Sequence, residues 1–327
     1  MAGKLAVVFG GSGFIGRNVV RELAKRGWRV RVAVRRPHHA LFLRPMGAVG
    51  QIQLAQANVR YRGSIAEALK GADAVVNLVG LLHQEGAQKF DMVQAGGAAA
   101  IAQLAAAEGV TNFVHVSAIG ADANSDSLYA RSKGLGEKAV RDAMPSAAII
   151  RPSVVFGTED KFFNKFAAML SMTPPFLPVP ILFGGGQTKF QPVYVDDVAD
   201  AICGALETPA AAGRTYEIGG PRVYTFKELL ELVLKETGRK RILLPVPFAL
   251  APVIGFAGEM VGLAPFFEPP VTRDQIRLMK HDNVVGAGGE TVGVIGDFGI
   301  APVTVEAVLP TYMVRFRKYG QFAEVTA

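Results

Sequence analysis

Short apolar runs alternate with amphipathic stretches over roughly the first 150 residues of the chain. The apolar runs have the length and composition of buried strands, and they lie at 5–9, 29–34, 51–56, 73–79, 112–117 and 147–151. Between them, the spacing of apolar residues predicts helices at 14–26, 64–70, 88–108 and 127–143. Because this alternation is typical of parallel strands joined by helical crossovers, we expect an α/β fold with a doubly wound parallel sheet.

The composition of the sequence changes after Arg151-Pro152, where proline-rich and glycine-rich loops follow. We expect a first domain at 1–155, whose sheet is completed by part of 190–220, and a smaller mixed lobe at 156–327. Helices are expected after Asp197 as an N-cap, at 225–237 and in the tail at 304–322. Ser64 and Glu67 have the spacing of a capping box at the start of the helix at 64–70.

A glycine-rich loop follows the first expected strand. Gly10, Gly13 and Gly16 are spaced as GxxGxxG between that strand and the next helix. In such a unit the glycines let backbone N–H groups approach a pyrophosphate, and the helix N-terminus adds positive potential. The flanking strand and helix make the motif far more specific than glycines alone. We expect a dinucleotide-binding Rossmann domain with contacts from Gly10, Ser12, Gly13, Phe14, Ile15 and Gly16.

The end of the second strand bears on the choice between NAD and NADP. An acidic residue there usually binds the ribose 2′-hydroxyl of NAD, but this strand ends in Arg35 and Arg36. Two guanidinium groups can hold a 2′-phosphate, which favours NADP(H), although a solvated basic turn is the alternative. His38 and His39 are interpreted as surface residues of this turn. Further pocket residues are expected at the later strand ends: Asn58 and Val59, then Leu78, Val79 and Gly80, and Pro152.

Tyr129 and Lys133 are spaced to share one face of a helix, and Ser117 ends the strand before it. An ammonium beside a phenol favours the phenolate, so we expect Lys133 to lower the pKa of Tyr129. Ser117, Tyr129 and Lys133 could then act as a general acid/base set for hydride transfer, with Lys133 also holding the nicotinamide ribose. The neighbouring His115 is interpreted as structural.

Composition narrows the function classes without choosing one. Half of the residues are hydrophobic, the net charge is +7 and the pI is near 9.5, and several Lys and Arg residues cluster at 21–44, where we expect the cofactor. The single cysteine, Cys203, excludes an intrachain disulfide and a cysteine-built metal site, and a core role is favoured over a reactive one.

The apolar stretch at 242–267 is too interrupted by proline to span a membrane, but it could lie on a membrane surface, on a partner or on its own domain. The first strand begins so early that we expect no signal or transit peptide, and hence a cytoplasmic protein, which we favour, or an already processed organelle protein.

These motifs resemble the extended or atypical branch of the short-chain dehydrogenase/reductase superfamily over roughly residues 3–245. The resemblance rests on the glycine loop, Ser117, Tyr129-x-x-x-Lys133, Arg151-Pro152-Ser153 and the stretch at 193–199. It implies the fold but leaves the function open, because this fold hosts reductases, epimerases, dehydratases and non-catalytic binders.

A narrower resemblance covers nearly the whole chain. It is to the alpha-subcomplex subunit nine family of NADH:ubiquinone oxidoreductase (respiratory complex I). The stretches that carry it are 113–117, 136–143, 151–160, 272–275, Asp282-Asn283, 297–300, 309–312 and 315–317.

That family implies an accessory subunit that holds a tightly bound NADPH, without turnover, near the membrane junction of the complex. Its carried-over residues are Gly10, Gly13, Gly16, Arg35, Tyr129 and Lys133. The implied partners are other complex I subunits and lipid headgroups, at the cytoplasmic face of a bacterial inner membrane or at the matrix side in a mitochondrion. The alternative is an active NADP-dependent reductase or sugar-nucleotide epimerase that uses Ser117, Tyr129 and Lys133.

Overall fold

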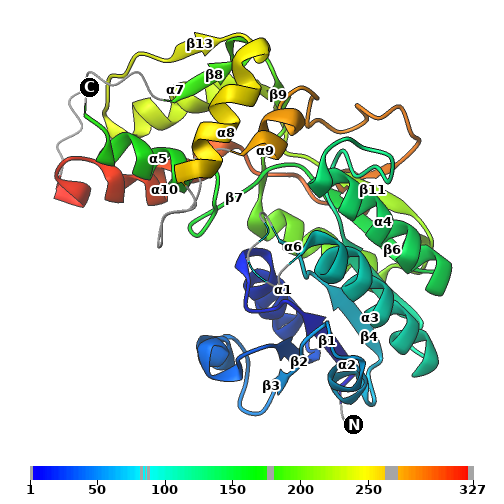
Figure 1. Ribbon diagram of the computed structural model, residues 1–327. Helices are drawn as coiled ribbons and strands as arrows, with labels where there is room; N and C mark the ends of the chain where they lie inside the picture. The colour runs from blue at the N-terminus through cyan, green and yellow to red at the C-terminus, as the bar shows by residue number, and fades with distance from the viewer. Residues whose placement is uncertain are drawn as a thin grey trace. The chain divides into compact units, whose positions relative to one another are not determined.

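The computed structural model describes residues 3–81, 84, 86, 89–174, 180–261 and 272–322. The chain forms two compact units, each assembled from three separate segments (Figure 1). The first unit contains Met1–Pro152, Val195–Ile218 and Gly288–Ala301, and the second contains Ser153–Tyr194, Gly219–Ala287 and Pro302–Ala327.

An eight-stranded parallel sheet forms the centre of the first unit, in the order β14-β11-β6-β5-β4-β1-β2-β3. Its strands are β1 (Leu5–Phe9), β2 (Arg29–Val34), β3 (Ile52–Gln56), β4 (Ala74–Asn77), β5 (Asn112–Val116), β6 (Ala148–Pro152), β11 (Thr215–Ile218) and β14 (Gly293–Val294). The expected doubly wound parallel α/β sheet is therefore confirmed. The chain order reverses between β1 and β4, and ligands of such sheets bind outside the carboxyl ends of the strands at this point.

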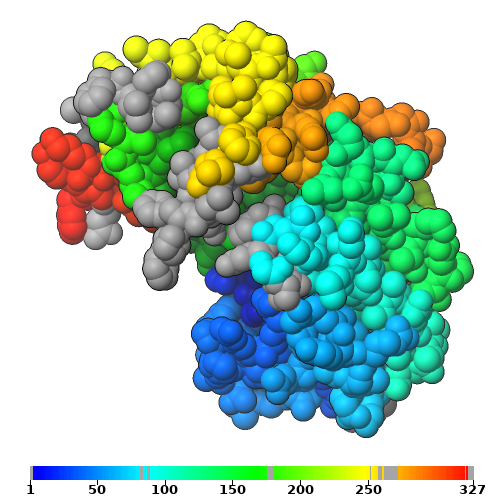
Figure 2. All heavy atoms as spheres, in the orientation of Figure 1, coloured from blue at the N-terminus to red at the C-terminus, as the bar shows by residue number. Residues whose placement is uncertain are grey.

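Helices cover both faces of this sheet. They are α1 (Phe14–Lys25), α2 (Arg62–Leu69), α3 (Gly96–Ala107), α4 (Leu128–Ala143) and α6 (Val195–Glu207), with short turns η1 (Pro37–Met46), η2 (Asp91–Ala95), η4 (Pro209–Ala211) and η6 (Ile295–Phe298). One buried cluster joins β1, β4, β5 and β6 to α2, α3 and α4, with Val7, Phe9 and Val75 among its strand residues. Side chains alternate along a strand, so Val8 and Val32 face the other way, toward the glycine loop and α1. In the space-filling view, α3 and α4 form adjoining parts of the surface (Figure 2).

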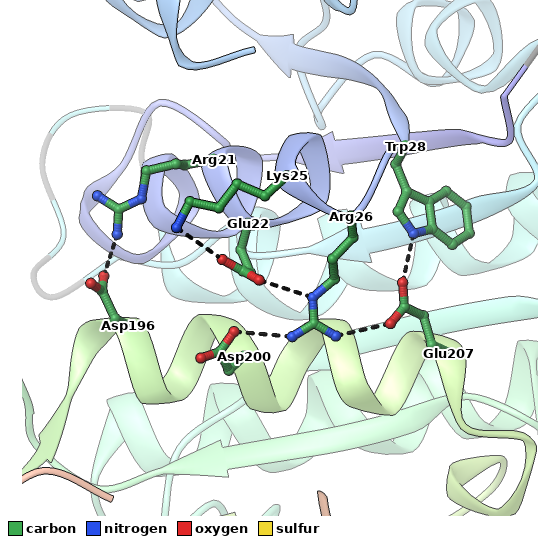
Figure 3. A network of polar contacts seen from close by, with 8 residues as sticks. All are labelled: Arg21, Glu22, Lys25, Arg26, Trp28, Asp196, Asp200 and Glu207. Atoms are coloured by element: carbon green, nitrogen blue, oxygen red, sulfur yellow. Dashed lines mark hydrogen bonds and ion pairs between the residues drawn. The ribbon is translucent and has the colours of Figure 1, made fainter. Parts of the chain in front are cut away.

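A network of ion pairs fastens α1 to α6 on the other face (Figure 3). Arg26 is its centre, because its guanidinium lies 3.0 Å from Glu22, 3.0 Å from Asp200 and 2.9 Å from Glu207. The indole Nε1 of Trp28 donates a 2.8 Å hydrogen bond to Glu207. The helix that begins at the glycine loop is thereby tied to a segment from much later in the chain.

Among its described residues, the second unit has three two-stranded sheets and an aromatic core. Its strands pair as β7 (Val155–Phe156) with β10 (Val193–Tyr194), β8 (Ile181–Phe183) with β13 (Leu244–Val246), and β9 (Lys189–Phe190) with β12 (Tyr224–Thr225). Its helical elements are η3 (Gly184–Gly186), α5 (Phe163–Met172), α7 (Phe226–Thr237), η5 (Phe248–Leu250), α8 (Ala251–Val261), α9 (Arg273–Leu278), α10 (Val305–Met313), η7 (Val314–Phe316) and η8 (Gly320–Phe322). Phe156, Phe163, Phe226 and Tyr312 are buried together in its core.

Several predicted helix ends were wrong. Helix α2 begins at Arg62, two residues before Ser64, because the Ser64 hydroxyl bonds to Asn58 and Tyr61 in the preceding turn instead of capping the helix. Helix α6 begins at Val195, so Asp197 lies in its first turn and not at its N-cap. The predicted tail helix breaks after Met313 into two short turns, the second of which opens at Gly320 with a φ of 57°.

The interrupted apolar stretch at 242–267 forms β13, η5 and α8 as far as residue 261, and its last residues lie outside the described part of the chain. Val253, Phe256 and Met260 of α8 are exposed, and α8 lies on the surface seen in Figure 2. Among the described helices, none has both the length and the apolar character needed to cross a bilayer.

Candidate functional site

The candidate residues of the first unit gather at the carboxyl edge of its sheet. The glycine loop follows β1, Arg35 and Arg36 follow β2, and Asn58 and Val59 follow β3. Leu78 to Gly80 follow β4, Ser117 follows β5, and Pro152 ends β6. Since the strands are parallel, all of these positions lie at one edge, on both sides of the point where strand order reverses.

The glycine loop is packed so tightly that larger residues do not fit. Gly10 has a φ of 80°, and a Cβ there would lie 3.1 Å from the carbonyl carbon of Leu78. A Cβ on Gly16 would lie 2.3 Å from the Gly10 oxygen. Gly13 is the N-cap of α1 and has no side chain that could accept hydrogen bonds from the first turn. The first N–H groups of the helix therefore remain available for an anion.

The end of β4 forms the floor beside this loop. The Asn77 Oδ1 accepts from the Val79 N–H at 3.1 Å, so its Nδ2 must donate to His115 Nδ1, also at 3.1 Å. His115 is buried, and burial together with the nearby Lys133 charge lowers its pKa to about 3. His115 is thus a neutral hydrogen-bond acceptor, which fits a structural role.

Arg35 and Arg36 lie exposed just beyond β2. They belong to the basic stretch at 21–44 and lie at the carboxyl edge of the sheet. Several other basic residues of the stretch at 21–44 are held by partners within the first unit. Arg21, Lys25 and Arg26 are engaged by carboxylates of α1 and α6, and Arg31 reaches the carbonyls of Ala68 and Lys70.

The loop after β3 is held by its own hydrogen bonds. Asn58 Oδ1 accepts from the Arg60 N–H at 3.1 Å, and Asn58 N–H donates to Ser64. The side chain of Val59 packs against Gly97 of α3, where an added Cβ would approach it to 3.0 Å. Pro152 is buried, and its carbonyl accepts from the Ile119 N–H. These residues are held at the carboxyl edge of the sheet by hydrogen bonds and packing.

Helix α4 brings Tyr129 and Lys133 to the same edge. Its N-cap is Ser127, whose hydroxyl accepts from the Ala130 N–H. Tyr129 is half-buried and packs edge-on against Phe90, while Lys133 is buried and donates from Nζ to the Val116 carbonyl at 3.2 Å. Because Val116 directly precedes Ser117, the lysine contact joins α4 to the strand end that carries the serine.

The expected effect of Lys133 on Tyr129 was wrong. Burial raises the pKa of Tyr129 to about 12. Burial also lowers the pKa of Lys133 to about 8, against the opposing effect of the Glu137 carboxylate. Burial is the only cause of the shift at Tyr129 and the larger cause at Lys133, because a buried phenolate and a buried ammonium each lose hydration. Tyr129 is therefore a protonated phenol at neutral pH.

The residues present suit a dinucleotide at this edge. A Cβ at Gly10 or Gly16 would not fit in the glycine loop. Two buried polar atoms, the Ser117 Oγ and the Gln94 Oε1, have no hydrogen-bond partner within the described residues. Buried polar groups are nearly always satisfied, so such atoms indicate a missing ligand group or water. Gln94 was not predicted from the sequence, since a glutamine inside an expected helix carries no motif.

A second missed feature lies one turn further along α4. Glu137 is paired at two points with Arg151, at 2.9 Å and 2.8 Å, and Arg151 also reaches Glu290 at 2.8 Å. These bonds raise the pKa of Arg151, so its charge is permanent. The pair locks α4 to β6 beside the site.

Known proteins resemble the chain at two levels. The family model "NAD dependent epimerase/dehydratase family" matches residues 6–219. In structure, a dTDP-glucose 4,6-dehydratase from Streptomyces venezuelae, solved with NAD bound, superposes with a TM-score of 0.68 at 20% identity over 95% of this chain and 96% of that chain. At that identity the likeness concerns the fold alone.

Two curated relatives resemble the chain in sequence. NADH dehydrogenase [ubiquinone] 1 alpha subcomplex subunit 9 of Mus musculus is 36% identical over 98% of this chain and 82% of its own length. A ceramide reductase of Caulobacter vibrioides is 32% identical over 79% of this chain and 77% of its own length. The chain belongs to the NAD dependent epimerase/dehydratase family and, within it, to the family of the complex I alpha subcomplex subunit 9.

Proposed function

We propose that this protein is an NADP(H)-binding accessory subunit of respiratory complex I, in which the nucleotide supports assembly or stability and is not turned over. The observation that carries the proposal is the extent of the similarity. The epimerase model ends at residue 219, whereas the similarity to the mouse complex I subunit runs over 98% of the chain. Most of the second unit, which the epimerase model does not cover, thus has counterparts in complex I subunits.

The choice of NADP(H) rests on the end of β2. Arg35 and Arg36 stand exposed at this position, where an NAD site would present an acid. A guanidinium binds a phosphate through two parallel hydrogen bonds, so these side chains suit the 2′-phosphate. The remainder of the dinucleotide would lie over the glycine loop and Gly80 and reach Lys133.

A structural role for the nucleotide agrees with the electrostatics of Tyr129. A general acid works best when its pKa lies near the working pH, and burial holds that of Tyr129 at about 12. A ligand that binds only the folded state stabilises it by mass action, without any turnover. Peripheral attachment at the cytoplasmic face of a bacterial inner membrane, or at the matrix side in a mitochondrion, would follow from this role.

The test is to isolate the tagged full-length protein from its native membranes in mild detergent. We expect complex I subunits to copurify, and deletion of the gene to lower the amount of assembled complex on native gels. Complementation with Tyr129→Phe should restore assembly, because the proposed role needs no proton transfer. Recovery of the protein without any complex I subunit would overturn the proposal.

A second function has its own support. The ceramide reductase relative indicates an enzyme that reduces a lipid-like carbonyl, and Ser117, Tyr129 and Lys133 are all present. In that reaction a hydride would pass from NADPH to the carbonyl carbon, and Tyr129 would give its proton to the oxygen, forming an alcohol and NADP⁺. Purified protein would then oxidise NADPH in the presence of a keto-lipid, and Tyr129→Phe would abolish the activity. If NADPH is oxidised no faster with the keto-lipid than without it, the protein is not a reductase of that lipid.

A further inference from the structure

Gln94 occupies an irregular turn beside the candidate nucleotide site. Residues Asp91–Ala95 form a single π-helical turn directly before α3. Turns of this kind are rare, and they are frequently found at functional sites. Phe90, at the start of the turn, packs against the ring of Tyr129.

The orientation of the Gln94 amide follows from its hydrogen bonds. Its Nε2 lies 3.3 Å from the Leu81 carbonyl, which can only accept, so this end of the amide must be the donor. The second Nε2 hydrogen points to the Ser132 Oγ at 3.2 Å, and Ser132 uses its own hydrogen on the Tyr129 carbonyl at 2.8 Å. Both donors are occupied, and the Oε1 atom is left as the free end.

That free oxygen is buried and lacks a partner. Gln94 is 3% exposed, and Oε1 has no hydrogen bond within the residues that the structure describes. A Cβ placed on Gly80 would lie 3.9 Å from Oε1 and 3.4 Å from the Lys133 Nζ. The acceptor of Gln94 and the ammonium of Lys133 therefore border the same small space over Gly80.

The chemistry of these two atoms selects the group that can fill the space. The ligand group must donate a hydrogen to Oε1 and accept one from Nζ. A carboxylate or phosphate oxygen cannot donate, and an ammonium cannot accept. A hydroxyl does both, as do a carboxamide and a water molecule, and Lys133 Nζ keeps hydrogens for such a group beyond the one that it gives to Val116. Binding of 2′-phospho-ADP-ribose, which has the distal ribose but no carboxamide, separates a ribose hydroxyl from the nicotinamide amide.

We propose that Gln94 is a cofactor-binding residue whose Oε1 accepts a hydrogen bond from a hydroxyl of the nicotinamide ribose, while Lys133 donates to the same ribose. The inference rests on the proposed dinucleotide site. Within that site it assigns the ribose at the nicotinamide end to a pair of groups on two elements, the π turn and α4. The adenine end is held elsewhere, by the glycine loop and Arg35.

The test uses three ligands that share the adenosine 2′-phosphate end. NADPH carries the distal ribose and the nicotinamide, 2′-phospho-ADP-ribose carries the distal ribose alone, and 2′,5′-ADP carries neither. Gln94→Met preserves the side-chain length and removes Oε1. We expect it to weaken NADPH and 2′-phospho-ADP-ribose about tenfold in calorimetric titrations, which is the effect of one lost buried hydrogen bond, and to leave 2′,5′-ADP unchanged.

Two further variants separate binding from packing. Gln94→Glu also loses the Nε2 donors but keeps an acceptor. It should therefore bind NADPH and 2′-phospho-ADP-ribose, the two ligands with the distal ribose, more tightly than Gln94→Met does. Ser132→Ala removes one partner of Nε2 and leaves Oε1, so it should affect all three ligands alike, if at all.

The outcomes distinguish this inference from the function on which it rests. Equal losses for all three ligands in Gln94→Met, or no loss for any, would overturn the role of Gln94 alone. Failure of the wild-type protein to bind either NADPH or 2′,5′-ADP would overturn the dinucleotide site and, with it, the inference.

Discussion

Arg151 and Glu137 form a two-point ion pair inside the first unit, with both side chains almost out of solvent, at 12% and 8% exposure. Arg151 is the penultimate residue of β6, and Glu137 lies one turn beyond Lys133 on α4. The pair therefore fixes the helix that carries Tyr129 and Lys133 to the sheet that carries the rest of the site.

Removal of this pair should be costly. We expect Glu137→Ala to lower the free energy of unfolding by about 3 kcal/mol in chemical denaturation, because it leaves a buried guanidinium short of a partner. The matched control is Asp142→Ala on the same helix, whose partner Lys138 is 68% exposed, and it should cost less than about 0.5 kcal/mol. Equal effects of the two variants would contradict the structural importance of the buried pair.

The stability of the nucleotide-free protein should depend on pH through Lys133. The pKa of this lysine is about 8 in the folded protein, against 10.5 ordinarily. Between these values the unfolded chain binds more protons than the folded one, so the free energy of unfolding rises with pH. Burial of the charged lysine thus costs about 3 kcal/mol below pH 8, and the cost disappears as pH approaches 10.5.

The measurement compares wild type with Lys133→Met in the absence of nucleotide. We expect the stability of the wild type, relative to this variant, to increase as pH is raised from about 8 toward 10. Lys138→Met, which removes an exposed lysine of the same helix, is the control. If the difference in unfolding free energy between wild type and Lys133→Met stays constant over this pH range, Lys133 is not desolvated in the folded protein.

Gly16→Ala tests the glycine cradle. The added Cβ would meet the backbone of Gly10 and Gly11 at 2.3 Å and 2.6 Å, so the loop must move. We expect a loss of about 1–3 kcal/mol in stability and at least a tenfold loss of affinity for NADPH, which carries the pyrophosphate. Gly63→Ala in α2, where the new Cβ meets nothing within 4 Å, should retain both properties. Normal nucleotide affinity in Gly16→Ala would place the pyrophosphate elsewhere.

Arg35→Asp tests the choice of nucleotide. Loss of a charge-assisted bond to the 2′-phosphate should weaken NADPH by about tenfold to a hundredfold and change NADH affinity far less. Arg29→Asp, at the opposite end of β2 and also exposed, makes the same change of charge away from the site. Equal losses of NADPH and NADH in Arg35→Asp would contradict recognition of the 2′-phosphate.

The sequence was sufficient for features that depend on local pattern. Strands β1 and β4 are short apolar runs buried on both faces, so their positions followed directly from hydropathy. The glycine loop could also be predicted, because the spacing of its glycines reflects close backbone packing at Gly10 and Gly16.

Features that depend on contacts between distant residues could not be predicted. The basic residues Arg21 and Arg26 look like a nucleotide-binding cluster in the sequence, but their partners come from α6, more than 170 positions away. The pKa of Tyr129 depends on how deeply α4 is buried, and spacing alone does not give that depth. The orphaned acceptor of Gln94 likewise arises from the π turn, which has no signature in the sequence.

The division of each unit among three segments has a consequence for synthesis on the ribosome. When translation reaches Pro152, six of the eight strands exist, but the outer edge of β6 has no neighbour until Thr215–Ile218 emerges. The carboxylates of α6 that neutralise Arg26 are also still missing. The nascent Rossmann half therefore carries an open hydrogen-bonding edge and an incomplete charge network while Ser153–Tyr194 of the second unit is being made. Such an edge is a site for mispairing and for chaperone binding.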